Sequence, residues 1–282
     1  MKSVSVVIPT FNRALKTARA VASVLYQSFT DYEIIVVNDG SRDGTEEILR
    51  QFGRRIRYIA LRSNQGVSAA RNRGVAESHA PWIAFLDSDD YWLPRKLEAQ
   101  TAFFRRHPQA LICQTQEIWV RNGRYVNPKK RHLKPSGDIF EPSLRLCLVS
   151  PSAVMLRRSL LEAAGPFDED LPVCEDYDLW LRIACQHPVH LIQDRLVVKE
   201  GGHSDQLSRR YRGMDRYRIQ AILKVLRSGI LTPGQIQTAL KELSRKCRIY
   251  GTGCLKRGRQ EEGEIYLNMA QAAEDPGHKA WP

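Results

Sequence analysis

The sequence predicts an α/β domain with a mixed, mainly parallel sheet flanked by helices, followed by a helical extension at its C-terminal end. Short apolar runs alternate with segments of helical periodicity over residues 1–97, which is typical of parallel βαβ units. Loops rich in Asn, Asp, Gly and Ser follow several of these runs, and such loops gather at the carboxyl ends of the strands in a parallel sheet. From residue 209 onward the apolar spacing is helical.

The first half is expected to contain four buried strands separated by helices. The strands are short apolar runs bounded by turn-forming residues: 4–8, 33–37, 56–60 and 82–86. The first helix is expected to bury the residues that share one face at spacings of three and four: Leu15, Ala18, Ala22 and Leu25. The helix after Gly66 is expected to turn Val67, Ala70 and Gly74 inward.

The second half continues with mixed elements. We expect strands over 110–120 and 151–156 and helices over 93–107, 158–164 and from residue 175. Residues 121–142 are basic and irregular; such a loop can cover a donor, contact an anionic acceptor, or be a solvated surface loop. Three helices are expected at the end, over 209–227, 232–257 and 261–273.

The charge of the chain is strongly positive and unevenly placed. The formal net charge is +12 over 282 residues, and residues 206–282 hold 15 Lys and Arg against 7 Asp and Glu. A basic surface favours polyanions such as anionic lipid headgroups or phosphorylated substrates, although a solvated face that only maintains solubility is the alternative. No zinc-finger, RNP or basic-zipper motif indicates nucleic acid.

The sequence shows no sign of export or membrane insertion. No run reaches the roughly 18 apolar residues of a membrane span, and the apolar start is short and ends at Pro9, so no signal peptide is expected. The cysteines form no Cys-x-x-Cys pair and no dense framework: 113, 147, 174, 185, 247 and 254. We therefore expect reduced thiols in a cytoplasmic protein.

Three carboxylates follow the fourth expected strand at once, at Asp87, Asp89 and Asp90. A buried charge without a partner costs several kcal/mol, roughly, so these groups are expected in a crevice at the strand end. Asp-x-Asp presents hard oxygen ligands to Mg²⁺ or Mn²⁺, which can hold a diphosphate; a solvated acidic turn is the alternative. Because no Gly-x-Gly-x-x-Gly or Gly-Lys-Ser/Thr motif occurs, dehydrogenase and P-loop interpretations are weak.

Four motifs in order carry a family resemblance. They are Val-Val-Ile-Pro-Thr-Phe-Asn-Arg, Val-Val-Asn-Asp-Gly-Ser-x-Asp-Gly-Thr, Asn-x-Gly-x-Ser-x-Ala-Arg-Asn-x-Gly and Phe-Leu-Asp-Ser-Asp-Asp, within residues 3–97. The set resembles the nucleotide-sugar half of family 2 glycosyltransferases of the GT-A fold. The resemblance implies a nucleoside-diphosphate sugar donor, a divalent metal and an inverting transfer. Asn38 stands where many relatives have a second aspartate, and Asp39 is kept.

The same resemblance assigns roles to individual donor-side residues. The nucleotide would be bound by residues of the first three motifs: Pro9, Thr10, Asn12, Arg13, Asp39 and Arg71. Asp39 would accept a hydrogen bond from the base, and Arg71 would reach the nucleotide. Asp87 would lie near the ribose, and Asp89 would be the leading metal ligand.

A second pair of motifs lies on the acceptor side. Gly-x-Phe-Asp-Glu, followed by Glu-Asp-Tyr-Asp-Leu-Trp-Leu-Arg, resembles the acceptor motif of the same family. By that resemblance Asp176 is the general base, and a poorly nucleophilic sugar hydroxyl needs such a carboxylate to take its proton. Without that context, acidic residues in a first helical turn are explained by the helix dipole alone. His203 resembles the late histidine that completes the metal site in GT-A enzymes.

Taken together, the sequence predicts a catalytic domain over 1–208, divided into a nucleotide-sugar half (1–97) and an acceptor half (98–208), and a basic helical extension over 209–282. The expected activity is metal-dependent transfer of a sugar, with a UDP-sugar as the default donor, to a glycan or lipid-linked acceptor in polysaccharide or glycoconjugate biosynthesis. Peripheral contact with the inner face of an anionic membrane is expected for the extension. The alternatives are a sugar nucleotidyltransferase and a non-catalytic nucleotide-sugar-binding scaffold module.

Overall fold

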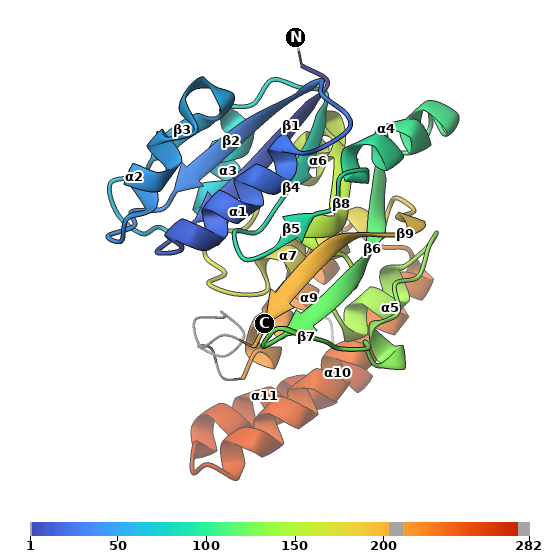
Figure 1. The fold of residues 1–282 in the computed structure, drawn as a ribbon. Coiled ribbons are helices and arrows are strands. Elements are labelled where there is room, and N and C mark those ends of the chain that lie inside the picture. The colour runs from blue at the N-terminus through green and yellow to red at the C-terminus, as the bar shows by residue number, and fades with distance from the viewer. Residues whose placement is uncertain (1, 203–210, 212, 276–282) are drawn as a thin grey trace.

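The computed structural model describes residues 2–202, 211 and 213–275 and shows a mixed sheet flanked by helices (Figure 1). The first half forms the parallel part of the sheet from β1 Val4–Thr10, β2 Tyr32–Asn38, β3 Arg57–Ala60 and β4 Trp82–Phe85. Between these strands lie α1 Ala14–Leu25, α2 Thr45–Arg50 and α3 Val67–Ala76. The alternation of strands and helices predicted for this half is confirmed.

The continuous apolar runs in these strands follow from burial on both faces. Val6 and Ile8 of β1 pack in one hydrophobic cluster with residues of α1, whereas Val7 packs in the cluster on the other face. Helix α3 lies so close to β1 that a Cβ at Gly74 would be 2.4 Å from a methyl carbon of Val7. Glycine at position 74 therefore permits the approach that brings α3 onto the sheet.

The predicted buried face of α1 is wrong. Leu15 is 78% exposed, and the residues that α1 buries are Thr17, Ala20, Val21 and Val24. Thr17 is accommodated in the buried face because its hydroxyl donates to the Arg13 carbonyl at 2.8 Å and bonds the Thr10 hydroxyl at 2.6 Å. The buried face therefore includes Thr17, whose hydroxyl has hydrogen-bond partners, and leaves out Leu15, which the apolar spacing favoured.

The second half adds antiparallel pairs and a further parallel pair to the sheet. Its strands are β5 Tyr91–Trp92, β6 Ile112–Arg121, β7 Arg124–Tyr125, β8 Val154–Arg157 and β9 His190–Gly201, and its helices are α4 Lys96–Arg106, α5 Phe140–Arg145, α6 Arg158–Ala164 and α7 Glu175–Ala184. The strand order is β3-β2-β1-β4-β8-β6-β9-β5, with β7 paired to β6. In this half β6 and β9 are parallel, and the other pairs are antiparallel.

Two features of the second half differ from the prediction. Strand β9 was not expected, and its pairing with β6 shifts register between Thr115 and Glu117, so its side chains do not alternate regularly. The segment after β6, expected to be irregular, begins with a hairpin whose turn residues Asn122 and Gly123 have φ values of 50° and 74°. Positive φ at both positions is the type I′ turn that Asn-Gly favours.

The C-terminal helices are α9 Asp215–Arg227, α10 Pro233–Leu255 and α11 Gln260–Glu274, close to the predicted ranges. Ile219 and Ile222 of α9 belong to the same hydrophobic cluster as Tyr177 and Trp180 of α7. The predicted division at residue 208 stays a prediction, but these helices and the acceptor half share one core. Within the described part of the chain, no helix has both the length and the apolar composition needed to cross a membrane.

Candidate active site

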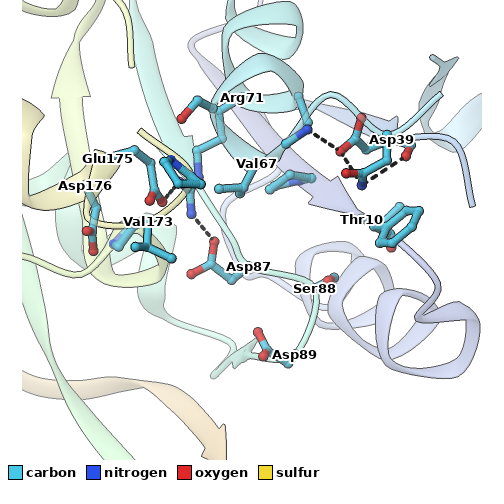
Figure 2. A pocket seen from close by; sticks show the side chains of 18 of the residues that line it. Thr10, Asp39, Val67, Arg71, Asp87, Ser88, Asp89, Val173, Glu175 and Asp176 are labelled. Atoms are coloured by element: carbon cyan, nitrogen blue, oxygen red, sulfur yellow. Dashed lines mark hydrogen bonds and ion pairs between the residues drawn. The ribbon is translucent and has the colours of Figure 1, made fainter. Parts of the chain in front are cut away.

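A cleft of about 920 Å³ opens at the carboxyl ends of β1, β2 and β4. Across it lie the first turn of α7 and the end of β9, so the two halves of the chain face each other (Figure 2). The cleft is lined by every described residue to which the sequence assigned a role: Pro9, Thr10, Asn12, Arg13, Asp39, Arg71, Asp87, Asp89 and Asp176. Their individual roles remain predictions.

The carboxylates of the Asp-Ser-Asp-Asp motif have three different environments. Asp87 accepts a 2.7 Å hydrogen bond from Arg71, and Asp89 forms a 2.8 Å ion pair with Arg13. Asp90 is buried; it accepts from the Ser152 hydroxyl at 2.6 Å and from the Glu200 backbone N–H at 3.1 Å. Asp87 and Asp89 are thus paired with arginines in the lining of the cleft, whereas Asp90 joins the motif to β9 and to the turn before β8.

Arg71 joins the two halves. Its guanidinium donates one 2.7 Å hydrogen bond to Asp87 and another to Glu175, and it lies over the Phe167 ring. Desolvation of the side chain lowers the pKa of Arg71, but the two carboxylates outweigh this effect and hold the pKa above its ordinary value. The predicted contact of Arg71 with the nucleotide stays a prediction; the observed contacts make it a bridge between carboxylates.

Asp39 holds the loop that leads into α3. Its carboxylate accepts from the backbone N–H groups of Gln65 at 2.7 Å and Gly66 at 2.9 Å, and from the Asn64 side chain at 2.9 Å. Burial raises the pKa of Asp39, while the backbone N–H groups lower it. Because a carboxylate has about four lone-pair sites, these bonds leave capacity for one further donor in the cleft, which is what the predicted contact with a base requires.

The loop after β1 is fixed by its own hydrogen bonds. Asn12 has φ of 51°, its backbone N–H donates to Ser41, and its side-chain oxygen accepts from the Arg42 N–H at 2.8 Å. These contacts tie the loop after β1 to the loop after β2. The two nucleotide-side motifs therefore form one wall, although they are far apart in sequence.

Asp176 lies in the first turn of α7, which is preceded by Cys174 in the left-handed region at φ 65°. One carboxylate oxygen accepts from the Tyr177 N–H at 2.7 Å. The other lies 3.4 Å from the Cys147 sulfur, whose thiol can donate to it or to the Val149 carbonyl at 3.3 Å. Burial, together with the Asp176 charge, raises the pKa of the Cys147 thiol well above its ordinary value. The thiol is therefore protonated near neutral pH and can act as a donor.

Glu175 is buried between Arg71 and Asp176. Burial and the neighbouring Asp176 charge raise the pKa of Glu175 to about 7, against the opposing effect of Arg71. The sequence motif gives Glu175 no role separate from that of Asp176, because the contact of Glu175 with Arg71 spans 104 residues. Nothing in the local pattern distinguishes it from a helix-capping carboxylate.

Lys199 on β9 is a second cleft residue that belongs to none of the sequence motifs. Its ammonium donates to the Ser150 hydroxyl at 3.1 Å. Burial lowers the pKa of Lys199, but the carboxylates of Glu117, Asp90 and Asp87 more than compensate and raise it above its ordinary value. Lys199 therefore brings a positive charge to the cleft floor. In the sequence, the apolar residues 196–198 are the one signal for the strand that carries Lys199.

The donor set of the cleft fits a hard divalent cation. His203, the predicted second ligand, lies outside the described residues, and among the described ones no group of three or more His, Cys, Asp or Glu residues is arranged to hold a metal. Mg²⁺ and Mn²⁺ commonly use one or two carboxylates and complete their shell with substrate phosphates and water. The oxygens of Asp87 and Asp89 in the cleft suit that mode of binding.

Comparisons with known proteins agree with this geometry. The family model described as "Glycosyl transferase family 2" matches residues 5–165. WfgD of Escherichia coli, a UDP-Glc:alpha-D-GlcNAc-diphosphoundecaprenol beta-1,3-glucosyltransferase, is 31% identical over 64% of this chain and 69% of its own length. Uncharacterized glycosyltransferases from Rickettsia conorii and Rickettsia felis are 29% and 30% identical, and the chain spans only about a third, 35%, of their length.

Solved structures show the same fold. The crystal structure of S. aureus TarS 1-349 in complex with UDP-GlcNAc superposes with a TM-score of 0.75 at 21% identity, covering 96% of this chain and 79% of that one. The mannosyltransferase PcManGT from Pyrobaculum calidifontis, in complex with GDP-Man and Mn²⁺, superposes with a TM-score of 0.65 at 17% identity, covering 96% and 73%.

Proposed function

Because the chain belongs to glycosyl transferase family 2, we propose that it is an inverting transferase that moves a sugar from a nucleoside-diphosphate donor to a hydroxyl group of a glycan or lipid-linked acceptor. The observation that carries the proposal is the arrangement of Asp176 across one cleft from Asp87 and Asp89. Polysaccharide or glycoconjugate biosynthesis is the setting that we propose, since WfgD acts on a diphosphoundecaprenol-linked sugar.

In the proposed reaction Asp176 is the general base. Its carboxylate takes the proton of the acceptor hydroxyl while that oxygen attacks the anomeric carbon of the donor sugar. The bond from the anomeric carbon to the nucleoside diphosphate breaks on the opposite face, and the diphosphate leaves with the bonding electrons. A single displacement of this kind inverts the anomeric configuration.

The donor site is proposed on the wall formed by the loops after β1, β2 and β4. Asp39 has one acceptor position left for a base N–H, and Arg13 places a cation beside Asp89. A Mg²⁺ or Mn²⁺ ion held by Asp89, with Asp87 beside it and His203 as a further proposed ligand, would neutralise charge on the leaving diphosphate. UDP is the proposed default nucleotide, with TDP and GDP as the other candidates.

A binding screen followed by a transfer assay tests the proposal. The purified chain is heated with Mn²⁺ and each of a panel of nucleoside diphosphates and their sugars. A ligand at about a hundredfold its dissociation constant adds roughly 2.7 kcal/mol to the unfolding free energy, so the cognate nucleotide is expected to raise the melting temperature. If a well-folded sample responds to none of them, the chain is better explained as a non-catalytic module.

The variant Asp176→Asn separates binding from chemistry. Removing a general base is expected to lower kcat by about 10²- to 10⁴-fold. The nucleotide should still raise the melting temperature, because Asp176 lies on the opposite side of the cleft, formed by the start of α7 and the end of β9, which we call the acceptor wall. A variant with undiminished kcat would show that another group accepts the proton.

A further inference from the structure

The segment after β6 begins with a hairpin and carries several cations; we call residues 121–134 the basic hairpin. It begins with the type I′ turn at Asn122 and Gly123, which pairs Val120 with Tyr125 and Arg121 with Arg124. The Val126 N–H then donates to the Trp119 carbonyl at 2.8 Å, which extends the hairpin contact by one residue. The tip is therefore held in a defined conformation.

A buried ion pair fixes the other end of the basic hairpin. The Lys134 ammonium lies 3.0 Å from the Glu117 carboxylate, and both side chains are less than a tenth exposed. Lys134 also donates to the Thr115 carbonyl at 3.2 Å. Arg121 is the last residue of β6, and Lys134 is bonded to residues of the same strand. The residues between these two positions therefore lie beyond the end of β6.

The outward residues combine positive charge with large apolar groups. No Asp or Glu occurs between residues 118 and 137. Four exposed cations form no salt bridge with a described residue: Arg121, Arg124, Lys129 and Lys130. Between them, Tyr125 is 83% exposed, Leu133 59% and Val126 38%. These are among the most exposed large apolar side chains described, and they are gathered in one segment.

The basic hairpin starts where the acceptor wall of the cleft ends. Strands β6 and β9 run side by side, with Val120 opposite Glu200 and Arg121 opposite Gly201, and Figure 1 shows β7 at the same end. Lys199 and Glu200 line the cleft. A surface bound by the hairpin would therefore lie at the edge of the cleft, next to the wall that carries Asp176.

We propose that the basic hairpin docks the protein onto an anionic membrane surface. Cations attract acidic headgroups, and exposed Tyr and Leu side chains insert at the level of those headgroups. A soluble polyanion would pair with the cations but gains nothing from exposed leucine and valine, so the apolar residues favour lipid. The reason for docking, access to a lipid-linked acceptor, rests on the proposed function. The membrane binding itself requires neither donor nor acceptor.

Co-sedimentation with vesicles tests the proposal. The probes are vesicles of phosphatidylcholine alone and of phosphatidylcholine mixed with phosphatidylglycerol. The triple variant Arg124→Glu/Lys129→Glu/Lys130→Glu is expected to bind the mixed vesicles at least about a hundredfold more weakly, since each basic residue at an anionic surface contributes about fivefold. Tyr125→Ser/Leu133→Ser, which keeps the charge, is expected to lose the binding that persists in high salt.

A charge-matched control lies in α10 and the turn that follows it, within the C-terminal extension for which the sequence favoured membrane contact. Lys241→Glu/Lys256→Glu/Arg257→Glu changes three exposed cations by the same total charge and is expected to leave vesicle binding unchanged. The proposal is wrong if the control weakens binding as much as the hairpin variant. Binding to soluble polyphosphate is measured in parallel. The proposal is also wrong if the hairpin variant loses binding to polyphosphate but keeps its binding to the mixed vesicles. Unchanged melting temperatures of all variants show that folding is intact, and the assay is independent of transferase activity.

Discussion

The guanidinium of Arg71 donates a 2.7 Å hydrogen bond to Glu175, which lies 104 residues later in the chain. Its other terminal nitrogen donates at 2.7 Å to Asp87. Asp87 is two residues before Asp89, and Glu175 directly precedes Asp176. One buried arginine therefore fixes the position of the proposed donor carboxylates relative to the proposed base.

Replacing Arg71 with alanine is expected to destabilise the protein strongly. Two carboxylates would lose their cation inside the structure, and breaking a buried ion pair in this way costs about 3–5 kcal/mol. Urea unfolding followed by circular dichroism measures the loss. Arg73→Ala is the matched control in the same helix, because its pair with Glu77 is exposed and contributes about 1 kcal/mol or less. Equal losses in the two variants would contradict the bridging role.

The sequence predicted the parts of the fold that depend on local pattern. The strand at residues 4–8 is apolar throughout because both of its faces are buried, and the polar loop after it necessarily reaches the edge of the sheet where the loop after β4 also ends. The common location of Asp39 and Asp87 in one cleft follows from that geometry. The C-terminal helices were predictable for the same reason, from their apolar spacing.

What the sequence did not predict depends on contacts between distant residues. Asp87, Asp89 and Asp90 are chemically identical in the motif, and only the positions of Ser152 and Glu200 distinguish Asp90 as a buried structural group. The bridge from Arg71 to Glu175 has the same origin. Lys199 was missed because the register shift within β9 breaks the alternation by which a strand is recognised.

Glu175 is expected to make stability depend on pH. Its pKa is raised from 4.5 to about 7 in the folded chain, so between these values the folded chain binds more protons than the unfolded chain. This contribution to stability is present at low pH and is lost as the pH rises through that window. For a shift of this size the loss is on the order of 3 kcal/mol.

The variant Glu175→Gln tests that dependence by difference. Glutamine cannot ionise, so the variant is expected to lose less stability than the wild type when urea unfolding is compared between about pH 4.5 and about pH 7.5. Glu162→Gln, at an exposed position on α6, should follow the wild type. Parallel curves for wild type and Glu175→Gln would mean that Arg71 keeps Glu175 ionised throughout this range.

Asp89 and Asp90 are adjacent but are expected to fail in different ways. Asp89→Asn removes the carboxylate proposed to hold the metal, so the shift in melting temperature that a nucleoside diphosphate and Mn²⁺ produce together should disappear. The melting temperature without ligand should fall less than in Asp90→Asn, because the Asp89 side chain keeps 16% of its surface exposed to water, whereas Asp90 is buried.

Asp90→Asn is expected to show the reverse pattern. An amide oxygen can accept from the Ser152 hydroxyl or from the Glu200 N–H, and the amide NH₂ then faces a second donor. One buried donor loses its partner at a cost of about 1–3 kcal/mol, so the melting temperature should fall while the metal-dependent shift is kept. The two assignments would have to be exchanged if Asp90→Asn abolished the shift and Asp89→Asn preserved it.

Cys147 is the described side chain that hydrogen bonds the Asp176 carboxylate, with its sulfur 3.4 Å from the nearer oxygen. Cys147→Ala removes this donor and is expected to lower kcat by up to about tenfold, the equivalent of a hydrogen bond of up to about 1.5 kcal/mol. The KM for the donor should stay the same, because Cys147 lies on the acceptor side. Cys147→Ser keeps an O–H donor and should recover most of the lost kcat.

Cys185, at the C-terminal end of α7, provides the control for this effect. The Cys185 thiol donates to the Arg182 carbonyl at the end of the helix away from Asp176, so Cys185→Ala removes a thiol that packs against α7 without touching Asp176. Steady-state kinetics of the three variants should therefore show a fall in kcat for Cys147→Ala alone. If Cys147→Ser is as slow as Cys147→Ala, or if Cys185→Ala is equally slow, then packing around α7 determines the rate, and the thiol does not orient the base.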